Sequence, residues 1–168
     1  MAMDRSLILI AHNVRSTHNV GSLLRTAEGL GVEAVYLTGY TPYPAEENDA
    51  RLPHISRKMQ GAIHKTALGA ETAITWHHQP DVLDVIANLQ ADGWTVVALE
   101  QADLAIAITE SKLPDKIALV VGREVEGIEP EILDACDTIV QIPMFGQKES
   151  FNVVQAAAMA LFWCRFMG

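Results

Sequence analysis

The 168-residue sequence has only two cysteines, Cys136 and Cys164, and they lie far apart. A disulfide framework or a cysteine-based zinc site is therefore not expected, and no metal is predicted. Long apolar runs are also missing, since the longest, 156–164, has about half of the roughly 18 residues that a membrane span needs. The N-terminus contains Asp4 and Arg5 and lacks the cleavage region of a signal peptide. These absences predict a cytoplasmic protein with no membrane partner.

Positive charge is scarce. The chain has 12 Lys and Arg against 21 Asp and Glu, for a net charge of −9. Such a balance argues against a nucleic-acid partner, because phosphate binding draws on Lys and Arg. The segment 51–65 is the exception, since it contains no acidic residue and carries Arg51, His54, Arg57, Lys58, His64 and Lys65. Two interpretations stay open: a basic RNA-binding face on an acidic body, or an ordinary solvated loop.

Several catalytic signatures are absent as well. The sequence has no G-x-S-x-G and no H-E-x-x-H, so no motif indicates a serine hydrolase or a zincin. The glycine-containing segment 122–127 is not the dinucleotide signature G-x-G-x-x-G, because Glu124 stands at its third position. It is not a P-loop either, since Ile128 and Glu129 follow it in place of Lys and Ser or Thr. Dinucleotide and nucleoside-triphosphate sites are therefore not favoured.

What the chain does contain is an alternation of short apolar runs with helical patterns. With 49% apolar and 20% charged residues, it reads as one globular domain, 1–168. Strands are predicted at 7–11, 34–37, 73–76, 94–99, 117–121 and 138–142, and helices at about 20–30, 61–67, 80–91, 130–135 and 151–167. The proline-rich segment 40–53 is predicted to be an exposed loop. Strands separated by helices indicate an α/β fold with layers around a parallel sheet.

Ligands of such sheets bind in the loops that follow the carboxyl ends of the strands. Four of these loops stand out: 13–19, the one after Leu99, the one that begins at Gly122, and 143–150. Taken singly, their residues have ordinary interpretations. Asn19 and Ser150 are good helix N-caps, and glycines after strands are most often turn residues.

The combination is more specific than its parts. In order, the chain reads Asn19-x-Gly21-x-x-x-Arg25-Thr26, Gly122-x-Glu124-x-x-Gly127, and Ile142-Pro143-Met144 with Ser150-x-Asn152. This order and spacing resembles the three motifs of the TrmH (SpoU) family of SPOUT methyltransferases, over about residues 7–163.

The resemblance implies a SPOUT-like domain with a C-terminal trefoil knot, an exception to the rule that chains do not knot. It also implies a homodimer and S-adenosylmethionine as the methyl donor for an RNA ribose 2′-hydroxyl. The residues expected on or beside the cofactor are Leu99, Gly122, Ile142, Met144, Ser150, Phe151 and Asn152. Catalytic candidates are Asn19, Arg25, Glu124, Ser150 and Asn152. RNA contacts are expected from Arg25, Arg51, Arg57, Lys58 and Lys65.

Chemistry refines the roles that the resemblance implies. A guanidinium almost never gives up its proton, so Arg25 is expected to clamp a phosphate and ease alkoxide formation rather than act as a base. Glu124 is expected to organise its loop or meet the partner subunit. Arg123, Phe151 and Val154 depart from the residues common in the family.

The substrate is less sharply defined. A domain without the family's RNA-binding extensions favours tRNA, with rRNA as the nearest rival. A non-catalytic RNA-binding or assembly factor of the same fold is a second class. A small-molecule enzyme, which the acidic charge favours, is a third.

The last predicted helix, 151–167, is apolar around nearly its whole circumference, with Asn152, Gln155 and Arg165 as its only strongly polar residues. A helix packed on one sheet face should keep a polar stripe. This pattern predicts a homodimer through the helix. The alternative is a helix wrapped on both sides by its own chain.

Overall fold

The computed structural model describes residues 5–168. Its centre is a seven-stranded sheet in the order β3-β2-β1-β6-β4-β7-β5, and every neighbouring pair is parallel. The strands are β1 Ser6–His12, β2 Ala34–Thr38, β3 Trp76–Gln79, β4 Thr95–Leu99, β5 Ile106–Ala107, β6 Lys116–Val121 and β7 Thr138–Gln141. The α/β fold with a parallel sheet is therefore as predicted.

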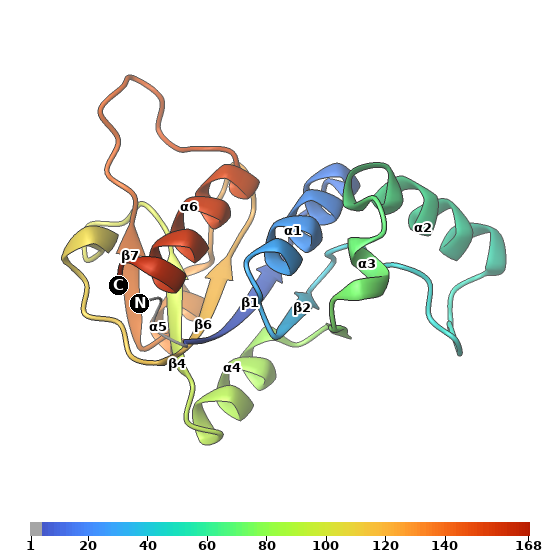
Figure 1. Ribbon diagram of the computed structural model, residues 1–168, viewed down its shortest axis with the longest axis horizontal. Coiled ribbons are helices and arrows are strands. Elements are labelled where there is room, and N and C mark those ends of the chain that lie inside the picture. Colours follow the sequence, from blue (N-terminus) through green and yellow to red (C-terminus); the bar gives the residue numbers. More distant parts are fainter. Residues whose placement is uncertain (1–4) are drawn as a thin grey trace.

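Helices cover both faces of this sheet (Figure 1). They are α1 Thr17–Gly29, α2 Pro53–Ala67, α3 Ala70–Ala73, α4 Val82–Ala91, α5 Pro130–Ala135 and α6 Val153–Phe166, with a 3-10 turn at Ile108–Glu110. Because strand side chains alternate between faces, Leu7 and Leu9 of β1 join the core under α1 and α6. Ile8 and Ile10 join a second core, under α4 and α5.

Two arginines tie the end of α6 to distant parts of the chain. Arg5 donates from Nη1 to the Cys164 carbonyl (3.0 Å), and its guanidinium is buried. Arg165 donates to the carbonyls of Leu30 (3.0 Å) and Gly31 (2.7 Å) at the end of α1. These bonds fix α6 across the same sheet face as α1. The trefoil knot stays a prediction.

The helix caps differ from those predicted. Ser16, not Asn19, caps α1, because the Ser16 hydroxyl accepts a hydrogen bond from the Asn19 backbone N–H (3.2 Å). Asn152, not Ser150, caps α6 by accepting from the Val154 N–H (2.9 Å). The prediction was wrong in both places because each segment offers two good capping residues within three positions. Asn19 consequently has its side chain free for other partners.

The polar elements were the hardest to place. The strand expected at 73–76 begins only at Trp76 and continues as His77-His78-Gln79, a polar edge strand without an apolar run. The short strand β5 was not predicted at all, and α2 begins earlier than expected, with Pro53 in its first turn.

The segment 40–53 is irregular, but it is not an ordinary exposed loop. Thr41, Pro42 and Pro44 are buried. Arg51 stacks over the Tyr43 ring at 3.7 Å and donates to Asp49 Oδ1 (2.8 Å) and to the Tyr43 carbonyl (2.9 Å). The guanidinium therefore holds the loop together. This corrects the expectation that Arg51 is available to RNA.

Gly21 allows α1 and α2 to pack closely. A Cβ at this position would overlap Thr66 Oγ1 and the Ile63 carbonyl oxygen of α2. The glycine of the first motif thus has a packing role. We expect Gly21→Ala to lower the free energy of unfolding by about 1–3 kcal/mol, as overpacking usually does.

Denaturant unfolding measures this effect. Gly29→Ala is the matched control, because Gly29 ends the same helix with nothing within 4 Å of its added Cβ. That control should be neutral or slightly stabilising, since alanine is the better helix former. Equal stability of the two variants would contradict the packing role.

None of the helices in residues 5–168 has both the length and the apolarity that crossing a lipid bilayer requires.

Candidate functional site

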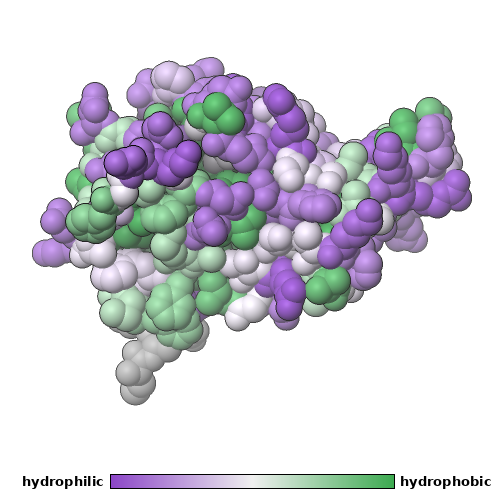
Figure 2. Space-filling model, turned by 90° about the horizontal axis from the view of Figure 1, so that it is seen from above, coloured by the Kyte–Doolittle hydropathy of each residue, from purple (hydrophilic) through white to green (hydrophobic). Residues whose placement is uncertain are grey.

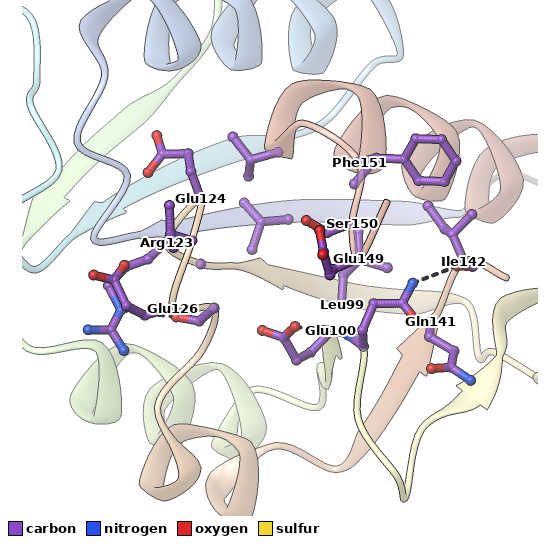
Figure 3. Close-up of a pocket in the computed structure, with 17 residues that line it drawn as sticks. Leu99, Glu100, Arg123, Glu124, Glu126, Gln141, Ile142, Glu149, Ser150 and Phe151 are labelled. Atoms are coloured by element: carbon purple, nitrogen blue, oxygen red, sulfur yellow. Dashed lines mark hydrogen bonds between the residues drawn. The ribbon is translucent and has the colours of Figure 1, made fainter. Parts of the chain in front are cut away.

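A cavity of about 320 Å³ opens at the carboxyl edge of the sheet, where the loops after β4, β6 and β7 meet the start of α6 (Figure 3). The residues that line it are Leu99, Glu100, Gln101, Val121, Gly122, Arg123, Glu124, Val125, Glu126, Gly127, Gln141, Ile142, Glu149, Ser150, Phe151, Val153 and Ala156. Its size falls within the usual range of small-molecule sites. It also lies where ligands of parallel sheets bind.

Most of the predicted cofactor residues meet here. Leu99, Gly122, Ile142, Ser150 and Phe151 come from four different segments and line the same cavity. Met144 and Asn152 do not line it. Of the catalytic candidates, Glu124 and Ser150 line it too.

The cavity has a charged end and an apolar end. In Figure 3, Arg123, Glu124 and Glu126 lie at one end, and Ile142 and Phe151 at the other. Glu100 and Glu149 add carboxylates between them, so the lining holds four acids and one cation. A ligand with a positive charge is favoured here, and a phosphate is disfavoured.

Two glycines allow the loop after β6 to fold back on itself. A Cβ at Gly122 would lie 2.6 Å from Ile128 Cγ1, and Gly127 has φ +70° beside the Glu100 carboxylate. Arg123 closes the turn by donating from Nε to the Gly127 carbonyl (3.1 Å). The motif glycines thus have both a conformational role and a close-approach role.

Glu100 was not among the predicted site residues. Its Oε2 accepts from the Ile128 N–H at 2.7 Å, which anchors the loop after β6 to the loop after β4. Next to it, Gln101 Nε2 donates to the Ile142 carbonyl at 2.7 Å and anchors the loop after β7. The only sequence signal was an acid and an amide directly after a buried strand.

Asn19, Glu124 and Asn152 form a polar cluster beside the cavity. Asn19 Nδ2 donates to Glu124 Oε1 (3.1 Å), and Asn152 Nδ2 donates to Asn19 Oδ1 (3.5 Å). The three side chains belong to three different predicted motifs. The structure therefore brings the motifs together at one point.

Arg25 lies apart from this cluster. It is exposed on α1, does not line the cavity, and forms no ion pair within residues 5–168. Six residues along a helix amount to a rotation of about 600°, which places Arg25 roughly 120° around α1 from Asn19. Within one chain, Arg25 and Asn19 thus face different directions.

A second polar cluster, also missed, supports the same loops. Glu129 accepts from Asn13 Nδ2 (3.0 Å) and lies 3.7 Å from Arg123 Nε and 3.6 Å from His12 Nε2. Burial lowers the pKa of His12 more than the nearby Glu129 carboxylate raises it. His12 is thus neutral at pH 7, and Arg123 supplies the positive charge that Glu129 faces.

The cysteines are not placed for chemistry. Burial raises the pKa of Cys136 to about 12 and that of Cys164 to about 11, so neither thiol ionises readily. Within residues 5–168 there is no group of three or more His, Cys, Asp and Glu side chains that could hold a metal ion.

Sequence comparison relates this chain to known proteins. The sequence model of the SpoU rRNA Methylase family matches residues 6–162. The chain is 31% identical over 160 residues to the 23S rRNA (guanosine-2′-O-)-methyltransferase RlmB of Salmonella typhi, covering 95% of this chain and 59% of that relative. It thus spans less than two thirds of the length of this curated relative.

Solved structures show the same fold. The TrmH/SpoU tRNA modifying enzyme of A. aeolicus superposes with a TM-score of 0.78 at 24% identity, covering 96% of this chain and 74% of the other. A structure described as giving insights into 2-OH methylation of C/U34 on tRNA has a TM-score of 0.73 at 20% identity, covering 96% and 95%. With the match of the family model over nearly its whole length, the chain belongs to the SpoU rRNA methylase family.

Proposed function

We propose that this chain is an S-adenosylmethionine-dependent RNA methyltransferase that acts on a ribose 2′-hydroxyl. The observation that carries the proposal is the meeting of three separate motifs at one cavity, with the Asn19–Glu124–Asn152 cluster beside it. Membership of the SpoU family supports it. So does the RlmB relative, which is named for 2′-O-methylation of guanosine.

The lining suits this cofactor. S-adenosylmethionine supplies an electrophilic methyl group on a cationic sulfur. The carboxylates of the charged end would stabilise such a ligand, and the apolar end beside Ile142 and Phe151 would accept its flat base. Leu99, Gly122 and Ser150 would complete the contacts, while Met144 and Asn152 would lie beside the site without lining it.

In the reaction, the bond from the ribose 2′-oxygen to the methyl carbon forms as the sulfur–carbon bond breaks. The electron pair stays on sulfur, and the hydroxyl proton leaves to solvent or to a neighbouring acceptor. Asn19 and Asn152 would position the ribose. Positioning alone can lower the activation barrier by several kcal/mol. Arg25 would hold a neighbouring phosphate and stabilise the developing alkoxide.

RNA would also contact α2. Arg57, Lys58 and Lys65 are exposed on this helix, which projects from the body of the molecule (Figures 1 and 2). Arg51 is not part of this surface, because its guanidinium is engaged within the loop. Arg57, Lys58 and Lys65 of α2 and Arg25 of α1 therefore stay as the proposed RNA contacts.

Between the two RNA classes, rRNA is now the first to test. The sequence pattern had favoured tRNA. The RlmB relative acts on 23S rRNA by its name, whereas the two neighbours named for tRNA share the fold at 24% identity or less. We therefore propose rRNA as the substrate and keep tRNA as the alternative.

We also propose that the working form is a homodimer through α6. Arg25 does not reach the cavity of its own chain, so a second copy would have to bring the two together. A non-catalytic RNA-binding factor of the same fold would need neither the cofactor nor this arrangement.

Calorimetry and methyl transfer test the function together. We expect one site per chain for S-adenosylmethionine and for its demethylated product. Tritium from the labelled methyl group should pass to unmodified 23S rRNA or to bulk tRNA. Cofactor binding without transfer to either RNA would favour the non-catalytic reading, and folded protein that binds neither compound would refute the proposal.

A further inference from the structure

An exposed aromatic ring and an arginine lie together at the carboxyl edge of the sheet, outside the cavity. Tyr40 follows β2 and is 51% exposed. Arg15, in the loop after β1, is also exposed, and its guanidinium carbon lies 5.9 Å from the centre of the Tyr40 ring. Such pairs bind unpaired nucleobases, because every base has a π face that stacks on aromatic and guanidinium planes.

The backbone under this pair is fixed from two sides. The Tyr40 N–H donates to Asn13 Oδ1 (3.0 Å), and the buried hydroxyl of Thr41 accepts from the Val14 N–H (3.0 Å). Asn13 is in the left-handed region at φ 54°, which asparagine tolerates better than most residues. A rigid platform loses little conformational freedom when it binds a ligand.

Asn13 also connects the pair with the cavity loops through a further hydrogen bond. Asn13 donates to Glu129 (3.0 Å), and Glu129 lies 3.7 Å from Arg123 in the loop that carries Glu124. Arg15 precedes Asn19 by four residues, a span of at most about 14 Å. A base stacked on Tyr40 would thus belong to a nucleotide near the one in the site.

The surface between the pair and α2 has the charge that RNA requires. Residues 5–27 contain no Asp or Glu, and Arg15, His18 and Arg25 are exposed among them. Thr66 Oγ1 donates to the His18 carbonyl (2.8 Å), which places the Lys65 end of α2 beside this segment. The basic side chains of residues 15–25 and of the Lys65 end of α2 therefore lie on neighbouring segments.

We propose that Tyr40 and Arg15 form a stacking platform for an unpaired RNA base close to the nucleotide that is modified. The proposal rests on the proposed function, because it assigns the pair to the RNA of that reaction. The platform fixes the position of the target ribose through its neighbour, and it tolerates different bases.

Fluorescence anisotropy with a labelled 12-nucleotide oligoadenylate tests the platform. Tyr40→Ala should weaken RNA binding about 5- to 150-fold, the loss expected for one stacked base. Tyr40→Phe should bind nearly as well as the wild type, because it keeps the ring. Tyr40→Leu should resemble the alanine variant, because it keeps apolar bulk without a ring.

Stacking has its own signal. With 2-aminopurine in place of one adenine, the wild type and Tyr40→Phe should quench its fluorescence, whereas Tyr40→Ala should not. Arg15→Ala should weaken binding and leave part of the quenching. Wild-type and Tyr40→Ala proteins with the same affinity and quenching, or a wild type that does not bind the oligomer, would overturn the platform.

Methyl transfer and cofactor calorimetry in parallel separate this proposal from the proposed function. An active wild type whose RNA affinity does not change when Tyr40 is replaced would refute only the platform. Tyr40-dependent RNA binding without methyl transfer would refute only the enzymatic function. Cofactor affinity should be the same in all of these variants, because Tyr40 does not line the cavity.

Discussion

Replacing Arg25 by alanine is expected to lower methyl transfer at least about 100-fold, the usual loss when one donor to a developing oxyanion is removed. Cofactor affinity should stay within a few-fold, because Arg25 does not line the cavity. Stability should hardly change, since the side chain is exposed and forms no ion pair within residues 5–168. Methyl transfer, calorimetry and thermal unfolding measure the three quantities.

Two further variants make this result specific. Arg25→Lys should recover little activity, because a point charge does not reproduce the planar fork that binds phosphate. Lys112→Ala removes an exposed cation elsewhere on the surface and should leave activity nearly unchanged. A parallel loss of cofactor binding in Arg25→Ala would move Arg25 from the RNA side to the cofactor pocket.

The fold could be predicted because its signals are local. The runs that became β1, β4 and β6 are continuous and apolar, as expected of the middle of a parallel sheet, and all three lie in its centre. The edge strand β3 was predicted at 73–76, three residues too early, because Trp76-His77-His78-Gln79 lacks such a run. Its place depends on pairing with β2, which no local pattern encodes.

The site could be predicted only at the residues of the three family motifs, which occur in order along the chain. Glu100 and Glu129 act through partners 28 and 116 residues away in the chain, on Ile128 and Asn13. A single acid after a strand carries no sign of such a partner. Arg51 shows the reverse problem, since a basic residue in a basic segment looks available to RNA until its bonds to Asp49 and Tyr43 are seen.

The net charge of the chain was also a poor guide to its ligands. A net charge of −9 argued against an RNA partner. Four of the acidic residues line the cavity, however, where they suit a cationic cofactor. Residues 5–27 and α2 contain no Asp or Glu, and their exposed Lys and Arg side chains are Arg15, Arg25, Arg57, Lys58 and Lys65. Net charge alone would thus misjudge a chain that, as we propose, binds one cationic and one anionic partner.

The α6 helix is expected to hold two copies of this chain together. Its inner side, with Val153, Ala157 and Leu161, is buried in the core. Its outer side exposes Met159 (39%), Phe162 (53%) and Phe166 (49%), and the two phenylalanine rings pack 4.9 Å apart. Figure 2 shows apolar side chains gathered on the side of the molecule where α6 lies.

The sequence left two alternatives open for this helix, a homodimer interface or a helix wrapped on both sides by its own chain. Residues 5–168 do not wrap the outer side of α6, so the helix is not covered by that part of its own chain. Monomeric proteins rarely expose contiguous apolar patches of this kind, and a second copy is the simplest cover. Light scattering at micromolar concentration should therefore give about twice the chain mass of 18.3 kDa.

Phe162→Asp should shift the protein to the mass of one chain, because a carboxylate in the middle of a dimer interface would be buried without a partner. Leu104→Asp introduces the same charge at a residue that is 87% exposed in the loop after β4, and it should leave the mass of the wild type unchanged. A wild type that already has the mass of one chain would defeat the dimer.

The dimer also predicts how the two site halves combine. If Arg25 serves the cavity of the partner, a mixture of Arg25→Ala and Glu124→Ala subunits should recover activity. In a mixed dimer, the Arg25→Ala subunit then contributes an intact cavity and the Glu124→Ala subunit contributes an intact arginine to the same site. If both groups serve the same chain, every site in the mixture carries one defect and activity stays low. Subunit exchange followed by methyl-transfer measurements distinguishes the two arrangements. Recovery in the mixture, together with its loss when Phe162→Asp is added to both subunits, would place Arg25 opposite the partner's cavity.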